Sequence, residues 1–298
     1  MRICFVTCND EPLLTRDDQL LTQYLLTKNI ITEAVIWDDD EVDWQQFDAI
    51  VLRSMWDYHT KTDKFIAWFN RLEILACKVL NPVSLVRWNL NKKYLEDISV
   101  SGALLPPFKF CVQNSIDSLP AIMKTNGWEK AVVKPAVSGG SFNTWITTVS
   151  PTVADEQKFA DMLRAGDVIV QKYMDEITTN GELSLMFFNK KFSHAVLKRA
   201  RQGDFRIQAK FGGTVEVFEP NESVINHAGA LLSTIDEPLL YARVDGIVGN
   251  DGRFYLMELE LIEPALFIGS SSTAACTNFY DALDNLLYSA RIRLPSSN

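Results

Sequence analysis

The sequence lacks the features that would place the chain in a membrane or in the secretory pathway. No run of 18 uncharged apolar residues occurs, which excludes an ordinary transmembrane helix. The apolar run near the N-terminus is too short for a signal peptide and fits a first buried strand better. The five cysteines form no Cys-x-x-Cys pair and have mostly apolar neighbours. We therefore expect reduced, mostly buried thiols in a cytoplasmic protein.

Positive charge and nucleotide-binding signatures are also scarce. The 29 Lys and Arg residues against 38 Asp and Glu residues give a net charge of −9. Outside a local basic groove, this balance argues against nucleic-acid and anionic-membrane partners. Neither Gly-x-x-x-x-Gly-Lys-Ser/Thr nor Gly-x-Gly-x-x-Gly is present. Their absence excludes a Walker A loop and the Rossmann dinucleotide fingerprint.

Hydrophobic residues are plentiful at 47%, so a chain of 298 residues can bury a sizeable core in one large or two to three small domains. Up to residue 80, strand and helix patterns alternate, which predicts a parallel α/β unit. The expected strands there are at residues 3–7, 34–37, 49–52 and 78–80. The expected helices are at residues 18–28 and 63–75.

The rest of the chain divides in two. Residues 107–171 have the size of a small α/β lid, with expected helices at 115–124 and 155–164 and strands at 131–134, 144–149 and 168–171. Strands then dominate, at residues 183–189, 192–197, 206–210, 214–218 and in a hairpin from 241 to 264. Helices are expected at residues 223–234 and 278–290. We predict an α/β fold, α+β in its C-terminal part, with domains at residues 1–90, 91–171 and 172–298.

The hairpin carries an unusual number of carboxylates. Asn250-Asp251-Gly252 between two β-prone runs predicts a tight turn. A two-residue turn would place Asp245 opposite Glu258 and Arg243 opposite Glu260. Like charges opposite each other destabilise a sheet, and buried carboxylates need a partner. A cluster of this kind predicts a Mg²⁺ site formed by Asp245, Glu258 and Glu260.

Alternation along the return strand sharpens this prediction. One face would be wholly apolar, with Tyr255, Met257, Leu259 and Leu261. The other face would hold both glutamates among Phe254, Leu256 and Ile262. Two alternatives stay open at this point: a half-solvated sheet face, or neutralisation by Arg243 without a metal.

Two further elements favour phosphate binding. A buried strand ends at Lys134 and continues into a loop of Ser138, Gly139, Gly140 and Ser141. Glycines allow backbone N–H groups to surround an anion, and the lysine adds a positive charge. Lys92 stands at an expected helix start, where it opposes the helix dipole unless it reaches a phosphate. A plain turn and a surface lysine are the alternatives.

The expected strand at 168–171 leads into a segment whose backbone could pair with a planar base edge: Gln171, Lys172, Tyr173 and Met174. Glu176 or Glu182 could then accept bonds from ribose hydroxyls. The alternative is an interdomain linker with exposed acids. Arg206, near Gly212-Gly213, could stabilise charge on a transferring phosphoryl group, or be solvated surface charge.

A substrate site is expected after the strand at 49–52. Ligands bind beyond the carboxyl ends of strands in open α/β sheets, and Arg53, Ser54, Trp56 and Tyr58 follow this strand. Arg53 could clamp a carboxylate between aromatic walls. A structural ion pair of Arg53 within an aromatic-packed loop is an equally weighted alternative.

In this order, the elements between about residues 84 and 268 resemble the ATP-grasp superfamily. The resemblance is closest to its glutathione-synthetase-like and ribosomal-protein-modifying ligase branch and to the cyclo-ligases of cycloserine biosynthesis. It implies an ATP-grasp fold with an N-terminal Rossmann-like α/β domain, a small lid domain and a C-terminal antiparallel-sheet domain.

Residue by residue, the resemblance assigns Lys92 and Lys134 to the phosphates, and it matches Arg206 to a less strongly patterned position. It assigns residues 171–174 to the adenine hinge and Glu182 to the ribose. The family motif Glu-x-Asn-x-x-x-Pro corresponds to Glu258 through Pro264, with Glu260 in place of the usual Asn. The implied metal is Mg²⁺ or Mn²⁺.

The resemblance also implies a chemistry. ATP would convert a carboxylate of a small amino-acid-like substrate into an acyl phosphate, and an amine would displace the phosphate, releasing ADP. The Gly-rich loop would exclude water, and Arg206 and Arg243 would steady the intermediate. Such a reaction needs little acid–base catalysis, which fits a chain with three histidines. A kinase, an intramolecular cyclo-ligase and a non-catalytic nucleotide-binding module are the alternatives, and a homodimer is an open expectation.

Overall fold

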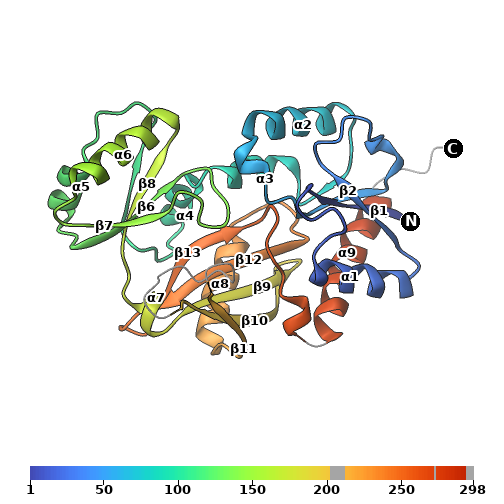
Figure 1. The fold of residues 1–298 in the computed structure, drawn as a ribbon. Coiled ribbons are helices and arrows are strands. Elements are labelled where there is room, and N and C mark those ends of the chain that lie inside the picture. Colours follow the sequence, from blue (N-terminus) through green and yellow to red (C-terminus); the bar gives the residue numbers. More distant parts are fainter. Residues whose placement is uncertain (202–211, 272, 293–298) are drawn as a thin grey trace.

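The computed structural model describes residues 1–201, 212–271 and 273–292, which form three β-sheets with helices packed on them (Figure 1). The N-terminal sheet is wholly parallel, in the order β2-β1-β3-β4. Its strands are β1 (Arg2–Thr7), β2 (Ile31–Ile36), β3 (Ala49–Ser54) and β4 (Val79–Leu80). The helices of this part are α1 (Arg16–Thr27), α2 (Thr62–Ile74) and α3 (Val83–Leu90). The predicted parallel α/β unit is confirmed.

The second sheet is antiparallel, in the order β5-β8-β6-β7. Its strands are β5 (Phe108–Cys111), β6 (Lys130–Pro135), β7 (Trp145–Thr148) and β8 (Val168–Lys172), and α4 (Tyr94–Val100) precedes them. Helices α5 (Leu119–Asn126) and α6 (Val153–Ala165) share one apolar core with these strands. Helix α5 begins four residues later than predicted, because Pro120 fits the first turn of a helix but not its interior.

The third sheet is antiparallel, in the order β11-β10-β9-β12-β13. Its strands are β9 (Glu182–Phe188), β10 (Lys191–Arg199), β11 (Thr214–Phe218), β12 (Tyr241–Val248) and β13 (Phe254–Glu260). The short helix α7 (Glu176–Thr179) precedes it, and α8 (Glu222–Ser233) packs on one face. The strand predicted at 206–210 lies outside the described residues.

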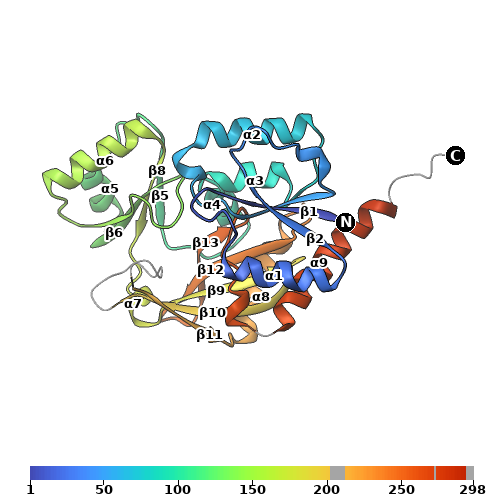
Figure 2. The same cartoon turned by 45° about the vertical axis from the view of Figure 1, so that its right-hand side comes forward.

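The C-terminal helix α9 (Thr273–Ile292) joins the third sheet to the first. One core cluster contains Phe5 of β1, Leu21 of α1, Met186 of β9 and Phe279 of α9. Figures 1 and 2 both show α9 beside α1, between the two sheets. The N- and C-terminal parts are therefore packed together, and the domain boundaries at residues 90 and 171 stay a prediction.

The hairpin pairs Asp245 with Glu258 and Arg243 with Glu260, as predicted. The turn itself is one residue longer than expected, because the Gly249 N–H donates to the Arg253 carbonyl at 2.9 Å. Gly252, at φ +76°, supplies the left-handed residue that a three-residue hairpin loop requires. A β-bulge between Asp245 and Gly246 then restores the predicted register.

This bulge makes the predicted face assignment wrong. Phe254 and Leu256 lie in the same buried core as Leu259 and Leu261, on the side of α8. An extra residue in a strand reverses the alternation beyond it. Glu258 therefore shares its side of the strand with Met257 rather than with Leu256, and both line a cavity.

Side chains from the N-terminal half satisfy the free edge of β13. The Leu259 N–H donates to the Tyr94 hydroxyl at 3.0 Å, and its carbonyl accepts from Asn89 at 2.8 Å. Asn89 also accepts from the Leu261 N–H, and Asn81 donates to the Leu261 carbonyl at 2.8 Å. An edge strand is thus fixed by side chains, which holds the carboxylates of β13 in place.

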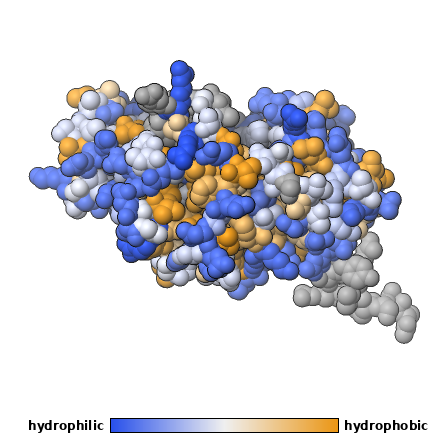
Figure 3. All heavy atoms as spheres, turned by 90° about the horizontal axis from the view of Figure 1, so that it is seen from below, coloured by the Kyte–Doolittle hydropathy of each residue, from blue (hydrophilic) through white to orange (hydrophobic). Residues whose placement is uncertain are grey.

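Within the described ranges, no helix is long and apolar enough to cross a bilayer. Figure 3 shows the face seen from below, where hydrophobic residues gather near the middle and hydrophilic residues surround them. The edge strand β11 exposes Val215, Val217 and Phe218.

Candidate active site

A cavity of about 740 Å³ lies where the three sheets meet. Fourteen predicted site residues line it: Trp56, Tyr58, Lys92, Lys134, Ser138, Gly139, Gly140, Ser141, Gln171, Glu182, Arg243, Asp245, Glu258 and Glu260. The loop after β3, the Gly-rich loop after β6 and the hairpin therefore meet around one space.

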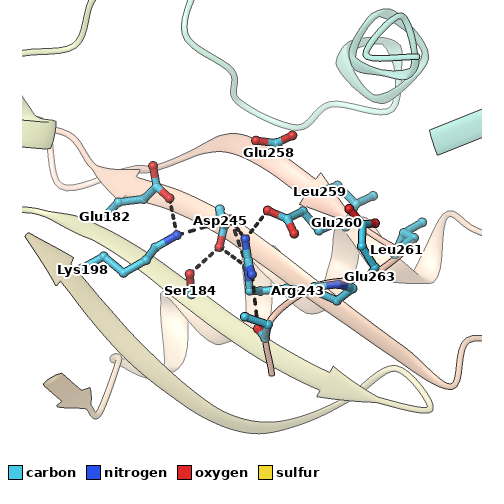
Figure 4. A network of polar contacts seen from close by, with 12 residues as sticks. Glu182, Ser184, Lys198, Arg243, Asp245, Glu258, Leu259, Glu260, Leu261 and Glu263 are labelled. Carbon is cyan, nitrogen blue, oxygen red and sulfur yellow. Dashed lines mark hydrogen bonds and ion pairs between the residues drawn. The ribbon is translucent and has the colours of Figure 1, made fainter. Parts of the chain in front are cut away.

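Asp245 is the most strongly bound carboxylate of the cavity (Figure 4). It is 2% exposed and accepts from Arg243 Nη2 at 2.9 Å, from Arg243 Nε and from the Ser184 hydroxyl. Lys198 Nζ lies 3.4 Å away. Burial opposes the charge, but Arg243 and then Lys198 outweigh it and hold the pKa of Asp245 at about 2. Asp245 is therefore ionised and fixed.

Arg243 also forms an ion pair with Glu260, its cross-strand partner. Burial raises the pKa of Glu260 to about 8, with the charges of Asp245, Glu258 and Glu263 adding to it and that of Arg243 opposing it. One arginine thus serves two carboxylates. A further cation beside them is electrostatically favoured.

Lys198 and Glu182 form a second buried pair across β10 and β9, with Lys198 Nζ 2.7 Å from Glu182 Oε1. Burial raises the pKa of Glu182 above its usual value. Glu182 is the predicted ribose carboxylate, whereas Lys198 was not predicted as a site residue. Its position directly opposite Glu182 in the strand pairing is the signal that could have found it.

Lys92 connects the Gly-rich loop to β13. Its Nζ lies 3.1 Å from Glu258 Oε1 and donates to the Ser138 carbonyl at 2.9 Å. Burial opposes the ionisation of Glu258, but Lys92 and Lys134 together keep its pKa below the usual value. The predicted helix-start lysine is therefore 6% exposed and directed into the cavity.

Lys134 differs from Lys92 because no hydrogen bond or ion pair joins its ammonium to any of the residues that the structure describes. Burial lowers its pKa, although Glu258 lies close enough to oppose the shift. Lys134 is partly buried, and an unpaired cation held partly away from water is costly. An anion in the cavity beside Lys134 would remove that cost.

The Gly-rich loop reaches across the cavity to the loop after β3. Gly140 and Ser141 both have positive φ, +55° and +61°, so the backbone turns sharply within this loop. A Cβ at Gly139 would lie 3.3 Å from Nδ1 of His59, and the Phe142 ring is 5.2 Å from the His59 ring. The loop thus closes the cavity on one side.

Of the four predicted hinge residues at 171–174, one lines the cavity. Gln171 is 1% exposed and lines the cavity, and among the described residues its Nε2 finds no acceptor. Lys172 and Tyr173 lie outside the lining, and their N–H groups donate to Pro107 and Lys130 carbonyls. Two other predicted residues also lie outside the lining: Met174 and Glu176, whose carboxylate accepts from the Asn250 N–H.

Of the four predicted substrate residues, two line the cavity and two do not. Trp56 and Tyr58 line the cavity, but Arg53 and Ser54 do not. Arg53 is 2% exposed, and its Nε donates to Asp18 Oδ1 at 2.7 Å, so its guanidinium is used by the fold. Ser54 is fully buried and shares a hydrogen bond with Thr7. Arg206 lies outside the described residues.

No group of three His, Cys, Asp or Glu side chains close enough to hold a metal ion occurs in the described ranges. Asp245 and Glu258 face each other across the hairpin, with Arg243 and Lys92 as their present partners. Mg²⁺ is commonly held by one or two carboxylates together with substrate phosphates. The donor set fits a metal bound in that way and not an all-protein cage.

Comparison with known proteins agrees with this geometry. Residues 3–81 match the family described as the N-terminal domain of the D-cycloserine synthetase DcsG. The cycloserine biosynthesis protein DcsG of Streptomyces lavendulae is 30% identical over 265 residues, covering 84% of this chain and 87% of that protein.

Solved structures give the same result. A crystal structure of D-cycloserine synthetase DcsG has a TM-score of 0.87 at 28% identity and covers 96% of this chain and 100% of its own. The fold is also that of D-alanine–D-alanine ligase from Bacillus anthracis, with a TM-score of 0.67 at 19% identity and coverage of 98% and 99%. The chain therefore belongs to the ATP-grasp superfamily and is an ATP-grasp ligase of the cycloserine-synthetase-like family.

Proposed function

We propose that the chain joins a carboxylate of a small amino-acid-like substrate to an amine, with ATP and Mg²⁺, through an acyl phosphate, releasing ADP and phosphate. The observation that carries the proposal is the meeting of Lys92, Lys134, Asp245 and Glu258 in one cavity. Lys134, partly buried and in no ion pair with the described residues, fits a phosphate, and Gln171 offers a free amide donor to a ligand. The relationship to DcsG supports the ligase class.

The residues divide the work. Lys92 and Lys134 would bind phosphates, and Asp245 with Glu258 and Glu260 would hold Mg²⁺, which when bound neutralises phosphate charge. Gln171 and Glu182 would contact the nucleoside. The Gly-rich loop would exclude water, so that the acyl phosphate reacts with the amine instead. Arg243 would stabilise the charge that develops at the carboxylate.

ADP release across an amino-acid panel tests the proposal. Lys134→Ala and Glu258→Gln should each lower it by about 10³-fold or more, because the first removes a charge that acts on the phosphates and the second removes a proposed ligand of Mg²⁺. Exposed Lys124→Ala and Glu96→Gln are matched controls that should behave as the wild type. Wild-type ADP release in both cavity variants would refute the assignment.

A second candidate is ligation within one molecule, favoured by the 30% identity to a cycloserine biosynthesis protein. Product mass distinguishes the outcomes: loss of water from a single substrate indicates a cyclo-ligase, and gain of a phosphate indicates a kinase. We place the reaction in the cytoplasm, which the five free cysteines support. A homodimer stays a prediction.

A further inference from the structure

The charges of the cavity pair with one another almost completely. Lys92 pairs with Glu258, Lys198 with Glu182 and Asp245, and Arg243 with Asp245 and Glu260. Among the described residues, two cavity charges take part in no ion pair: Lys134 and Glu263. Lys134 fits the phosphate-binding role that the proposed function gives it. Glu263 carries a negative charge, so its ligand must be a group other than phosphate.

Glu263 lies at the end of the cavity that the N-terminal sheet forms. It follows β13 by three residues, and Figure 4 shows Glu258, Glu260 and Glu263 in succession along this part of the chain. Trp56 and Tyr58, from the loop after β3, line the same cavity. The Trp56 indole N–H donates to the Glu263 carbonyl at 3.2 Å, and the Tyr58 hydroxyl is a hydrogen-bond neighbour of the Glu263 carboxylate.

The backbone that carries Glu263 is fixed to an unusual degree. Each of five consecutive carbonyls, from residue 262 to residue 266, accepts a hydrogen bond from a side chain of another element. The donors, in order, are Tyr241, Trp56, Arg53, Arg243 and His194, at 2.8, 3.2, 3.0, 3.2 and 2.8 Å. A segment without regular secondary structure is thereby held in one conformation. Such support is what a preorganised binding residue requires.

We propose that Glu263 selects an amine-bearing substrate, with its carboxylate binding the substrate's ammonium group beside Trp56 and Tyr58. The inference rests on the proposed function, whose substrate class it specifies. An ammonium group has three donors, and a carboxylate is an acceptor only. The aromatic ring of Trp56, a residue that lines the cavity and is 41% exposed, also favours a nearby cation. A hydroxyl in the same place would leave this partly buried carboxylate without a counter-charge.

A second metal ligand is the competing role for Glu263. Asp245, Glu258 and Glu260 would hold the proposed metal, and they lie on the paired strands β12 and β13, of which β12 also carries Arg243. Glu263 lies beyond the strand, against aromatic groups of the N-terminal part. The two roles predict different losses when the carboxylate is removed: loss of substrate affinity in one case, loss of Mg²⁺–nucleotide affinity in the other.

The test measures binding by calorimetry in the presence of a non-hydrolysable ATP analogue and Mg²⁺. The probes are pairs that differ only in an ammonium or a hydroxyl, such as alanine and lactate of each hand, or serine and glycerate. We expect the wild type to prefer the ammonium member. Glu263→Gln should weaken its binding by about 30-fold or more and leave the hydroxy acid and the nucleotide analogue unchanged.

Two variants make the result interpretable. Glu263→Asp keeps the charge on a shorter side chain and should retain the ammonium preference at lower affinity, which guards against a folding effect of the Gln variant. Glu96→Gln removes an exposed carboxylate and should bind every probe as the wild type does.

Three results would overturn the inference: no ammonium preference in the wild type, an unchanged preference in Glu263→Gln, or a loss confined to the Mg²⁺–nucleotide analogue. Failure of the proposed function is a separate result. Ammonium preference that depends on Glu263, with no ADP release from any probe, would support this inference and refute the ligase reaction.

Discussion

Two buried arginines have nearly the same surroundings and different positions relative to the cavity. Arg53 is 2% and Arg243 8% exposed, and each pairs with one aspartate, Asp18 at 2.7 Å and Asp245 at 2.9 Å. Each also donates to the segment that carries Glu263 and lies within 6 Å of an aromatic ring centroid; the acceptors are Pro264 and Ala265 and the rings Tyr241 and Phe267.

The difference between them is access. Arg243 lines the cavity and contacts a second carboxylate, Glu260, which also lines it. Arg53 lies outside the lining, behind the segment that both arginines hold. Both arginines have a full set of partners. We infer that Arg243 can act on a ligand because it lines the cavity, whereas Arg53 is structural because it does not. Three substitutions and one titration test this distinction.

The largest effect is expected for Arg243→Met. Removing the guanidinium takes away the charge proposed to act at the reacting carboxylate, so kcat/KM for ADP release should fall by about 10³-fold, or about 4 kcal/mol. Stability should fall less than in an Arg53 variant, because Mg²⁺ can reach Asp245 and Glu260 through the cavity. Added Mg²⁺ should therefore raise the melting temperature of Arg243→Met more than that of the wild type.

The control for this substitution is Arg164→Met. Its side chain is 62% exposed on α6, so neither activity nor Mg²⁺ response should change. Wild-type activity in Arg243→Met would show that the two arginines do not differ in function.

Arg53→Met should act on stability instead. It leaves Asp18 buried and unpaired, which typically costs about 3–5 kcal/mol. Denaturant unfolding measures the loss, and the kcat of the folded protein should stay within a few-fold of the wild type. The double variant Arg53→Met/Asp18→Leu should recover most of the stability, since it removes both charges. A collapse of kcat with unchanged stability would contradict the structural role.

Arg53→Lys is a smaller change. A lysine can keep the charge beside Asp18 but cannot also place a second planar donor on the Pro264 carbonyl. We expect a loss of about 1–2 kcal/mol for one unsatisfied buried acceptor. Because Pro264 follows Glu263, KM for the amine-bearing substrate should rise a few-fold while kcat is unchanged. Steady-state kinetics separates this from a purely global destabilisation, which would leave KM alone.

The arginines also show what sequence reasoning could reach. Asp245, Glu258, Lys92 and Lys134 were found because each breaks a local rule, as a carboxylate on a buried strand or a lysine where a helix or core disfavours it. The parallel N-terminal sheet followed from the alternation of strand and helix patterns. The predicted hairpin register holds only because the bulge compensates for the longer turn. Arg53 is likewise a charged residue directly after a buried strand. No local feature of the sequence shows that its role is structural.

What sequence reasoning missed depends on contacts between distant segments. Asp18 lies 35 residues before Arg53, and Asn81 binds a carbonyl 180 residues away. The reversed alternation at Leu256 arises from a bulge, which the composition of the strand does not encode. Glu263 takes part in no ion pair among the described residues, so its place in the cavity is visible only once the other charges have been paired.

The smallest effect concerns His194, the donor to the same segment whose side chain ordinarily titrates between pH 5 and pH 8. His194 is buried, and its Nε2 donates to the Leu266 carbonyl at 2.8 Å, while Nδ1 lies 2.9 Å from the Ser193 hydroxyl. Burial lowers its pKa, against the Leu266 bond and the charge of Asp17, so the fold favours the neutral imidazole. Its contribution to stability is complete above the unfolded pKa of about 6.5 and is lost as pH falls below that value.

His194→Gln isolates this effect, because glutamine keeps an N–H donor and does not titrate. The free energy of unfolding of the wild type minus that of the variant should be nearly constant around pH 8 and decrease from about pH 7 to pH 5, by less than either Arg53 substitution costs. A difference that is constant or that grows on acidification would show that the histidine is not held neutral. The arginine donors keep their charge throughout this range, so acid should loosen the segment at Leu266 while Pro264 and Ala265 remain bound.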